Sequence, residues 1–147
     1  MDKKQLITLC LDIVNGKLLD VQNAIDGYKI DLMSETKSSA GDKHETGRAM
    51  LQLEMEKLGQ QHQTILMQKE VLSKIQVAVS TKIALGSLVV FNGIYYFIAT
   101  SIGQVKYSKK TVMVVSVNSP IGVLLLGKEK GSKLVFNGKR FVVQDVL

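Results

Sequence analysis

A single apolar seam runs through the first 32 residues and constrains the fold more than any other feature. Its positions alternate in steps of four and three residues: Ile7, Leu11, Val14, Leu18, Val21, Ile25, Tyr28 and Leu32. This spacing lines the side chains along one side of an α-helix and is typical of coiled-coil packing. Gly16 and Gly27 lie off the seam, where each costs about 1 kcal/mol of helix propensity relative to alanine. The sequence therefore predicts a long N-terminal helix that packs against another helix.

A second seam begins at residue 51 and repeats every seven residues. It comprises Leu51, Leu58, Ile65, Leu72 and Val79, with Met55 and Ile75 at intermediate positions. Each predicted helix has about 30 residues and a length of about 45 Å. The segment between the helices is so short that they must be antiparallel neighbours. We expect an antiparallel coiled-coil hairpin over residues 1–80, with its tip near residues 34–46.

From residue 84 the pattern changes to short apolar runs separated by turn residues. Such runs flank Asn92-Gly93 and Asn137-Gly138, and Asn-Gly in that setting is the strongest short signal for a β-hairpin. One further run, at residues 111–117, has the composition of a strand. We expect about five strands in residues 84–147.

One short helix is predicted between these strands, within NSPIGVLLLGK. Ser119 suits its N-cap, Pro120 its first helical position, and Gly127 a left-handed stop. Together with the strands, this helix makes residues 84–147 a small α+β domain. The predicted fold class of the whole chain is therefore α+β, with a helical hairpin followed by a sheet domain.

Charge is divided unevenly between the two halves of the chain. Residues 1–81 carry 10 Lys and Arg against 11 Asp and Glu, whereas residues 82–147 carry 9 against 2. The second half therefore accounts for the net charge of +6. A basic half indicates an acidic partner, either nucleic acid or an acidic protein surface, or a general contribution to solubility.

Three features bear on the cellular compartment. The uncharged stretch 83–105 is long enough for a membrane span, but the Asn92-Gly93 turn inside it argues for strands. The single cysteine, Cys10, excludes an intramolecular disulfide and fits a reducing compartment. The opening MDKKQL lacks the apolar segment of a signal peptide. We expect a cytoplasmic protein without a membrane span.

Two motifs, VNSPIGVLLLGKEKGSKLVF at residues 117–136 and Gly41-Asp42-x-x-Glu45, resemble those of the bacterial GreA/GreB family of transcript-cleavage factors. The first is similar to the C-terminal motif of that family: Ser-Pro, a short apolar helix, Leu-Gly-Lys and then a strand. In the first half the likeness is one of architecture together with Gly41-Asp42-x-x-Glu45, which in the family supplies the acidic tip of the coiled coil. The resemblance implies an FKBP-like fold for residues 84–147, without implying prolyl isomerase activity.

The resemblance also implies a function. Such factors insert the hairpin into the secondary channel of RNA polymerase, while the C-terminal domain docks at the channel entrance. Asp42 and Glu45 would help to hold a second Mg²⁺ in the polymerase active centre and would speed hydrolysis of the extruded RNA 3′ end in backtracked complexes. The chain itself would be a monomer and not an enzyme, with no cofactor bound alone. Ser119, Pro120 and Lys128 would contact the polymerase.

Asp42 and Glu45 also have a structural interpretation. At the head of a helix, Asp42 can accept from the N–H of the third helical residue while Glu45 reaches back to the cap, which forms a capping box. As metal ligands they would be insufficient alone, because Mg²⁺ takes about six oxygen ligands. They fit a site whose other ligands come from elsewhere, as in two-metal hydrolysis. Both interpretations stay open.

The chain departs from the family beside these acids. The family usually continues Asn-Ala-Glu-Tyr, whereas here Glu45 is followed by Thr46-Gly47-Arg48-Ala49. Lys37, Lys43 and Arg48 would oppose cation binding. Two alternatives therefore stay open: a polymerase channel regulator that does not stimulate cleavage, and an FKBP-like chaperone or prolyl isomerase-type interaction module with a dimerising coiled coil.

The remaining candidate residues point to no second chemistry. His44, between the two acids, is a ligand, a proton donor or a solvated loop residue. Cys10 has no evident base beside it, and no Cys or His pair has the spacing of a zinc site. Two groups of lysines could dock an acidic protein surface or RNA: Lys106, Lys109 and Lys110, and Lys128, Lys130 and Lys133.

Overall fold

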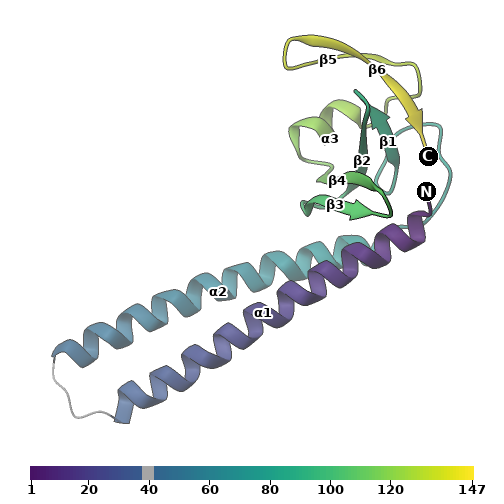
Figure 1. The fold of residues 1–147 in the computed structure, drawn as a ribbon. Helices are drawn as coiled ribbons and strands as arrows, with labels where there is room; N and C mark the ends of the chain where they lie inside the picture. Colours follow the sequence, from purple (N-terminus) through teal and green to yellow (C-terminus); the bar gives the residue numbers. More distant parts are fainter. Residues whose placement is uncertain (38–41) are drawn as a thin grey trace. The chain divides into compact units, whose positions relative to one another are not determined.

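The structure is a computed structural model that describes residues 1–37 and 42–147, with side chains described for residues 1–34 and 46–147. The elements follow in the order α1 (Lys3–Lys37), α2 (Asp42–Lys74), β1 (Leu88–Phe91), β2 (Ile94–Ala99), β3 (Gly103–Tyr107), β4 (Lys110–Ser116), α3 (Pro120–Leu125), β5 (Lys133–Phe136) and β6 (Lys139–Val146). Two long helices thus precede a sheet with one short helix (Figure 1). This order confirms the predicted α+β class.

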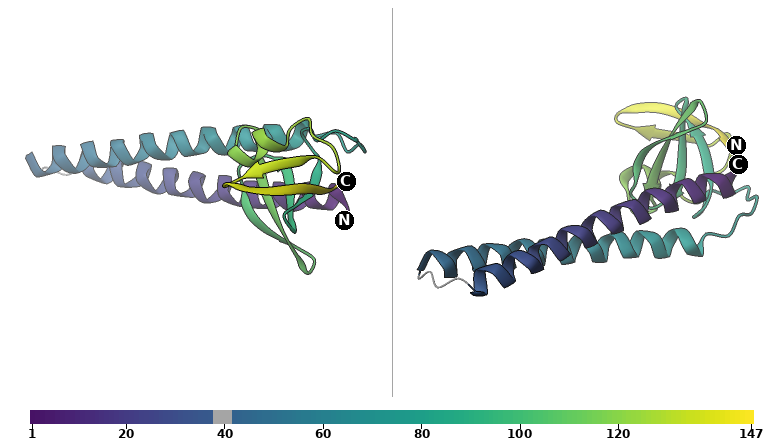
Figure 2. Two further views of the ribbon diagram at one scale, coloured as in Figure 1. Left: turned by 90° about the horizontal axis from the view of Figure 1, so that it is seen from above. Right: turned by 60° about the horizontal axis from the view of Figure 1, so that its bottom comes forward.

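Helices α1 and α2 lie side by side and run in opposite directions (Figures 1 and 2). They have 35 and 33 residues, which corresponds to about 50 Å each. Every position of the predicted α1 seam is buried or half-buried, and Val14 is fully buried. On α2, Ile65 and Leu72 are buried, and Leu51 and Leu58 are half-buried. The predicted antiparallel hairpin is confirmed.

The prediction that the second seam continues to Val79 is wrong. Helix α2 ends at Lys74, and the Val79 side chain is 91% exposed. The segment after Lys74 is rich in β-branched residues, which lose side-chain freedom in a helix. A hydrogen bond from outside α2 also holds this segment, since Lys3 Nζ donates to the Ala78 carbonyl at 3.0 Å. The chain therefore leaves the helix before the apolar repeat ends.

The sheet has six strands in the order β3-β4-β2-β1-β6-β5. Strands β2 and β4 pair in parallel, and every other pair is antiparallel. The sequence predicted about five strands and missed β3. That strand buries only Val105 of its five residues, so it lacks the alternating apolar pattern of the others.

Both predicted Asn-Gly turns are confirmed. Asn92 and Gly93 have φ values of 53° and 70°, and Asn137 and Gly138 have 53° and 77°. Positive φ at both central residues defines the type I′ turn, whose twist matches that of the flanking strands. The turns connect β1 to β2 and β5 to β6.

One hydrophobic cluster of the C-terminal half lies between α3 and one face of the sheet, and the other face also buries side chains such as Phe97 and Val112. The buried members of the cluster are Ile83, Val89, Phe91, Tyr96, Ile98, Ile121, Leu125, Leu134 and Val143. The Phe91 ring meets Phe136 and Phe141 edge-on, at centroid distances of 6.4 and 5.5 Å. The uncharged stretch 83–105 thus supplies strands and core residues, and within the described residues no helix has the length and apolarity of a membrane span.

The chain divides into two compact units. Residues 12–69 form the hairpin unit, and residues 1–11 together with 70–147 form the sheet unit. Within the sheet unit, the Tyr107 hydroxyl donates to Gln5 Oε1 at 2.6 Å. The domain boundaries expected from the sequence, 1–80 and 84–147, and the FKBP-like assignment stay predictions.

Candidate functional site

Helix α3 begins as the sequence predicted. Ser119 is its N-cap, and Ser119 Oγ accepts from the Gly122 N–H at 3.0 Å. The same hydroxyl donates to the Ser116 carbonyl at 2.6 Å, so it links the helix to the end of β4. Pro120 occupies the first turn, and Gly127 has a φ of 78° after the last turn. The Ser-Pro motif therefore has a defined structural role.

A close backbone approach fixes α3 on the sheet unit. A Cβ atom at Gly122 would lie 2.1 Å from the Ser116 carbonyl oxygen and 2.9 Å from Ser119 Oγ. Side chains with a Cβ do not fit at such distances without movement of the backbone. Ile121 and Leu125 on the same side of the helix are buried. Helix α3 is thereby held with its opposite side toward solvent.

That opposite side is apolar, which the sequence analysis missed. Pro120 is exposed, Val123 is 63% exposed and Leu126 is 44% exposed. Pro120 and Val123 lie three residues apart on one side of the short helix, and Leu126 is its C-cap. We call these three residues the α3 face. In the sequence, Val123 and Leu126 belong to one apolar run together with the buried Ile121 and Leu125. Only their spacing relative to those two residues separates the exposed side chains from the buried ones.

Lys128 follows the α3 face directly. Its N–H donates to the Leu125 carbonyl at 3.0 Å, and its carbonyl accepts from the Ile83 N–H at 2.8 Å. The backbone is therefore anchored while the side chain is exposed. The resemblance pointed to Ser119, Pro120 and Lys128. Ser119 and Pro120 lie at the start of α3 and Lys128 lies just after its end, so Ser119 and Lys128 flank the α3 face, to which Pro120 belongs.

The other candidate site is the far end of the hairpin unit. Helix α2 begins at Asp42, so Asp42 and Glu45 belong to its first turn. Their side chains lie outside the described residues, as do those of Lys37, Lys43 and His44. The capping and metal-ligand interpretations of the two acids both stay predictions.

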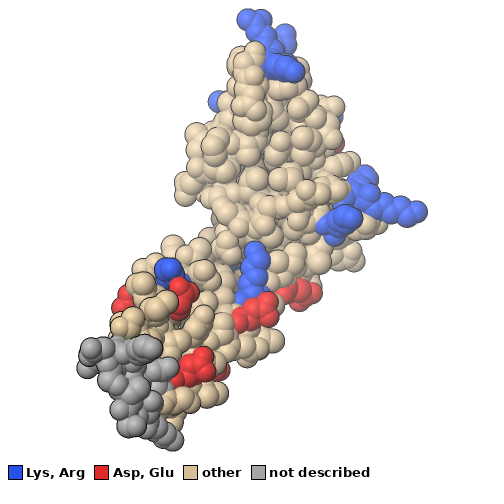
Figure 3. Space-filling view, turned by 60° about the vertical axis from the view of Figure 1, so that its left-hand side comes forward, with Lys and Arg blue, Asp and Glu red and all other residues tan. Residues whose placement is uncertain are grey.

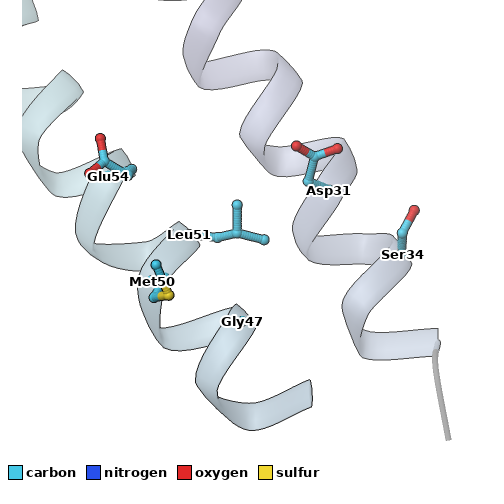
Figure 4. A pocket seen from close by; sticks show the side chains of 6 residues that line it. All are labelled: Asp31, Ser34, Gly47, Met50, Leu51 and Glu54. Atoms are coloured by element: carbon cyan, nitrogen blue, oxygen red, sulfur yellow. The ribbon is translucent and has the colours of Figure 1, made fainter. Parts of the chain in front are cut away.

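A hollow of about 430 Å³ lies between the helices near this end (Figure 4). It is lined by Asp31 and Ser34 from α1 and by Gly47, Met50, Leu51 and Glu54 from α2. In Figure 4 the Leu51 side chain extends toward α1. Ser34 and Gly47 are small, which explains why the space between the helices is unfilled here. Among the described residues no three Asp, Glu, His or Cys side chains gather as metal ligands.

Four large apolar side chains near the hollow are exposed. Ile30 and Met33 on α1 are 65% and 59% exposed, and Met50 and Leu53 on α2 are 65% and 54% exposed. They lie off the two seams, so they are not needed for helix pairing.

Cys10 is not a reactive thiol. Its side chain is fully buried, and burial raises the pKa of the Cys10 thiol to about 11. The thiolate, which is the nucleophilic form, is therefore scarce at neutral pH.

The two groups of lysines lie on exposed parts of the sheet unit. Lys110 is held in place, because its Nζ donates to the Tyr95 hydroxyl at 3.1 Å and lies 5.0 Å from the centre of that ring. Lys130 Nζ lies 3.9 Å from Asp145 Oδ1. Figure 3 shows both carboxylates and cations along the hairpin, and cations that stand out from the sheet unit.

No protein-family model and no curated protein matches the chain. Among solved structures, it is similar to the crystal structure of GreA factor homolog 1 (Gfh1) protein of Thermus thermophilus. The two share 18% sequence identity over 93% of this chain and 94% of that one, with a TM-score of 0.38. The crystal structure of Thermus aquaticus Gfh1 is similar at 21% identity over 92% of each chain, with a TM-score of 0.35. These identities and TM-scores are too low to carry a function over to this chain.

Proposed function

We propose that the chain is a transcription elongation factor that binds the secondary channel of RNA polymerase and stimulates transcript cleavage in backtracked complexes. Asp42 and Glu45 supply two carboxylates to a Mg²⁺ that the polymerase and the RNA hold. Asp42 and Glu45 would help to hold this Mg²⁺, and the ion would supply the activation of a water for hydrolysis of the RNA phosphodiester, as in other two-metal hydrolyses. The chain acts on the polymerase's own reaction and is not itself an enzyme.

One observation carries this proposal: the acidic pair belongs to the first turn of the returning helix in an antiparallel hairpin about 50 Å long. A hairpin of that length can deliver two carboxylates into a narrow channel. Two carboxylates alone bind Mg²⁺ weakly because most of its ligand positions would still be water. The pair therefore suits a shared site better than a site that the chain owns.

The α3 face suits the second contact that the proposal requires. It presents Pro120 and Val123 to solvent beside Lys128, and residues 82–147 carry a large excess of cations. An apolar patch with a positive border fits an apolar patch with an acidic border on the polymerase surface. The exposed apolar side chains of the hairpin, such as Met50 and Leu53, fit the walls of a protein channel.

The test is RNA cleavage in backtracked elongation complexes of the cognate polymerase. The wild type is compared with Asp42→Asn/Glu45→Gln, which removes both charges and keeps the side-chain size. The matched control is Asp20→Asn/Glu56→Gln, which makes the same charge change at exposed positions elsewhere on the hairpin. We expect the wild type and the control to accelerate cleavage, and the Asp42/Glu45 variant to lose about a hundredfold or more of this acceleration.

Binding to the polymerase is measured in parallel. If all three proteins bind and none accelerates cleavage, the acids are a helix cap and the protein is a regulator that does not stimulate cleavage. Arg48 is an exposed cation close to the acids in sequence. It would then be the first residue to substitute, to test whether its charge prevents Mg²⁺ binding. If none binds, the polymerase proposal is wrong.

A further inference from the structure

Strand β5 is an edge of the sheet. It pairs with β6 alone within the described part of the chain, so its second edge carries backbone N–H and C=O groups without a neighbouring strand. The cross-strand register pairs Leu134 with Phe141, and these face the core. Because successive residues of a strand point to opposite faces, the neighbouring pairs face outward.

The outward pairs combine cations with exposed valines. Lys133 pairs with Val142, and Val135 pairs with Arg140. Both cations are exposed, Val135 is 58% exposed and Val142 is 45% exposed. Diagonal neighbours on one face lie about 7–8 Å apart, so the two valines form an apolar centre with a cation on either side. We call these four residues the outer β5–β6 face.

A hollow of about 360 Å³ adjoins this face. Arg140, Phe141, Val142 and Gln144 line it from β6, and Asn92 and Gly93 line it from the β1–β2 turn. Gln144 Oε1 accepts from the Gly93 N–H at 2.7 Å, which fixes one wall of the hollow. Since β1 and β5 flank β6 on opposite sides, the hollow lies on the side of β6 away from the free edge of β5 and bounds the outer β5–β6 face there.

Charge selects the ligand. Residues 82–147 contain only two acids, Glu129 and Asp145, and Asp145 lies beside Lys130. Within the described residues no salt bridge involves Lys133 or Arg140. Edge lysines discourage pairing with a neutral or basic strand, and like charges directly opposite are destabilising. A second copy of this chain is therefore a poor occupant, and an acidic strand is a good one.

The face fits a polypeptide better than a nucleic acid. A strand added to a sheet edge uses both backbone donors and acceptors, whereas a phosphate backbone offers acceptors only. Single-stranded nucleic acid gains much of its affinity by stacking on aromatic rings, and the outer β5–β6 face has valines in their place. We propose that an acidic extended segment of a partner protein docks on the outer β5–β6 face and extends the sheet at β5. Its carboxylates pair with Lys133 and Arg140, and its apolar side chains cover the valines.

This proposal does not depend on the proposed role in transcript cleavage. The probe is a fluorescein-labelled peptide of alternating residues, Glu-Val-Glu-Val-Glu-Val-Glu, titrated with the full chain and followed by fluorescence anisotropy. The same peptide with lysine in place of glutamate, and a single-stranded oligonucleotide, are the comparison ligands. Backbone amide NMR shifts on addition of the peptide locate the bound segment.

The decisive variant is Lys133→Glu/Arg140→Glu, and the matched control is Lys106→Glu/Lys109→Glu on the β3–β4 hairpin, which makes the same change in net charge. We expect saturable binding of the acidic peptide, amide shifts at residues 133–142, and a loss of affinity of about tenfold or more in the decisive variant alone. The control should stay within about twofold.

Three results would overturn the proposal. The first is no binding of the acidic peptide. The second is an equal loss of affinity in both variants, because net charge alone would then explain the binding. The third is tight binding of the oligonucleotide that is lost in the decisive variant, which would make the face a nucleic-acid surface. Folding of both variants is checked by the dispersion of their amide spectra.

Discussion

The tightest backbone approach among the described glycines is at Gly122, where a Cβ would lie 2.1 Å from the Ser116 carbonyl oxygen. Because that neighbour is backbone, a Gly122→Ala variant must shift α3 or the end of β4. We expect a destabilisation of about 1–3 kcal/mol, measured as a fall in the free energy of unfolding in urea. The side chain of Ser119, which caps the helix from the same point, would be displaced as well.

Gly16→Ala is the matched control for this substitution. Gly16 is exposed on α1, and a Cβ there meets nothing within 4 Å. Alanine should therefore stabilise the helix by up to about 1 kcal/mol. Equal effects of the two substitutions would contradict the close approach at Gly122.

The Cys10 thiol should make stability depend on alkaline pH. Its pKa is raised from 9.0 to about 11 in the folded chain, so the folded thiol keeps its proton where the unfolded thiol loses it. The contribution to stability is complete below about pH 9 and is lost between about pH 9 and 11. We expect the free energy of unfolding to fall there by at most about 1.4 kcal/mol per pH unit, relative to Cys10→Ala. Parallel pH profiles for the two proteins would refute this.

At the scale of the elements, the end of α2 separates two residues that the heptad pattern treats alike. Leu72 is 1% exposed within the helix, whereas Val79 is 91% exposed beyond it. We predict that Leu72→Ala lowers the free energy of unfolding by about 2–5 kcal/mol, and that Val79→Ala changes it by less than about 0.5 kcal/mol. Urea unfolding of both variants measures the difference. A large loss of stability in Val79→Ala would indicate that the apolar seam of α2 continues to Val79.

Local signals predicted most of the elements. The Asn-Gly turns and the Ser119 cap depend on the conformation of a few neighbouring residues, so sequence is sufficient to find them. The α1 seam repeats over many turns, which makes a chance pattern improbable. Strand β3 was missed although its partner β4 follows directly in sequence, because the Ser108-Lys109 turn between them lacks the Asn-Gly signal and β3 buries only Val105. The end of α2 was missed because a residue far away in sequence holds the segment beyond it: Lys3 Nζ donates to the Ala78 carbonyl.

The candidate sites were predicted only in part. The acidic pair and the Ser-Pro motif are visible in sequence because the residue types are distinctive. The exposure of Val123 and Leu126 could not be predicted. In the sequence, an apolar residue in a short apolar run is the same whether its side chain faces the core or the solvent. The outer β5–β6 face was missed for a related reason, because its valines complete a normal alternating strand.

At the scale of the whole molecule, the net charge differs between the two parts of the chain. Residues 1–81 are close to neutral, and residues 82–147 carry the excess of cations. Such a division suits a protein in which one part attaches to an acidic surface while the other carries carboxylates to a separate place. Under the proposed function, the separate place is the active centre of RNA polymerase.

Tethered hydroxyl-radical cleavage tests that claim most directly. Met50 lies near the far end of the hairpin and is 65% exposed, so Met50→Cys can carry an iron chelate while Asp42 and Glu45 stay intact. Labelling is specific because Cys10, the only natural cysteine, is fully buried. Lys17→Cys, exposed on α1 far from residue 50 along the hairpin, is the matched control.

In backtracked elongation complexes, we predict cuts in the nascent RNA near its 3′ end from position 50 and none from position 17. A protein that binds the polymerase but cuts the RNA from neither position, or equally from both, would contradict delivery of the hairpin end to the active centre.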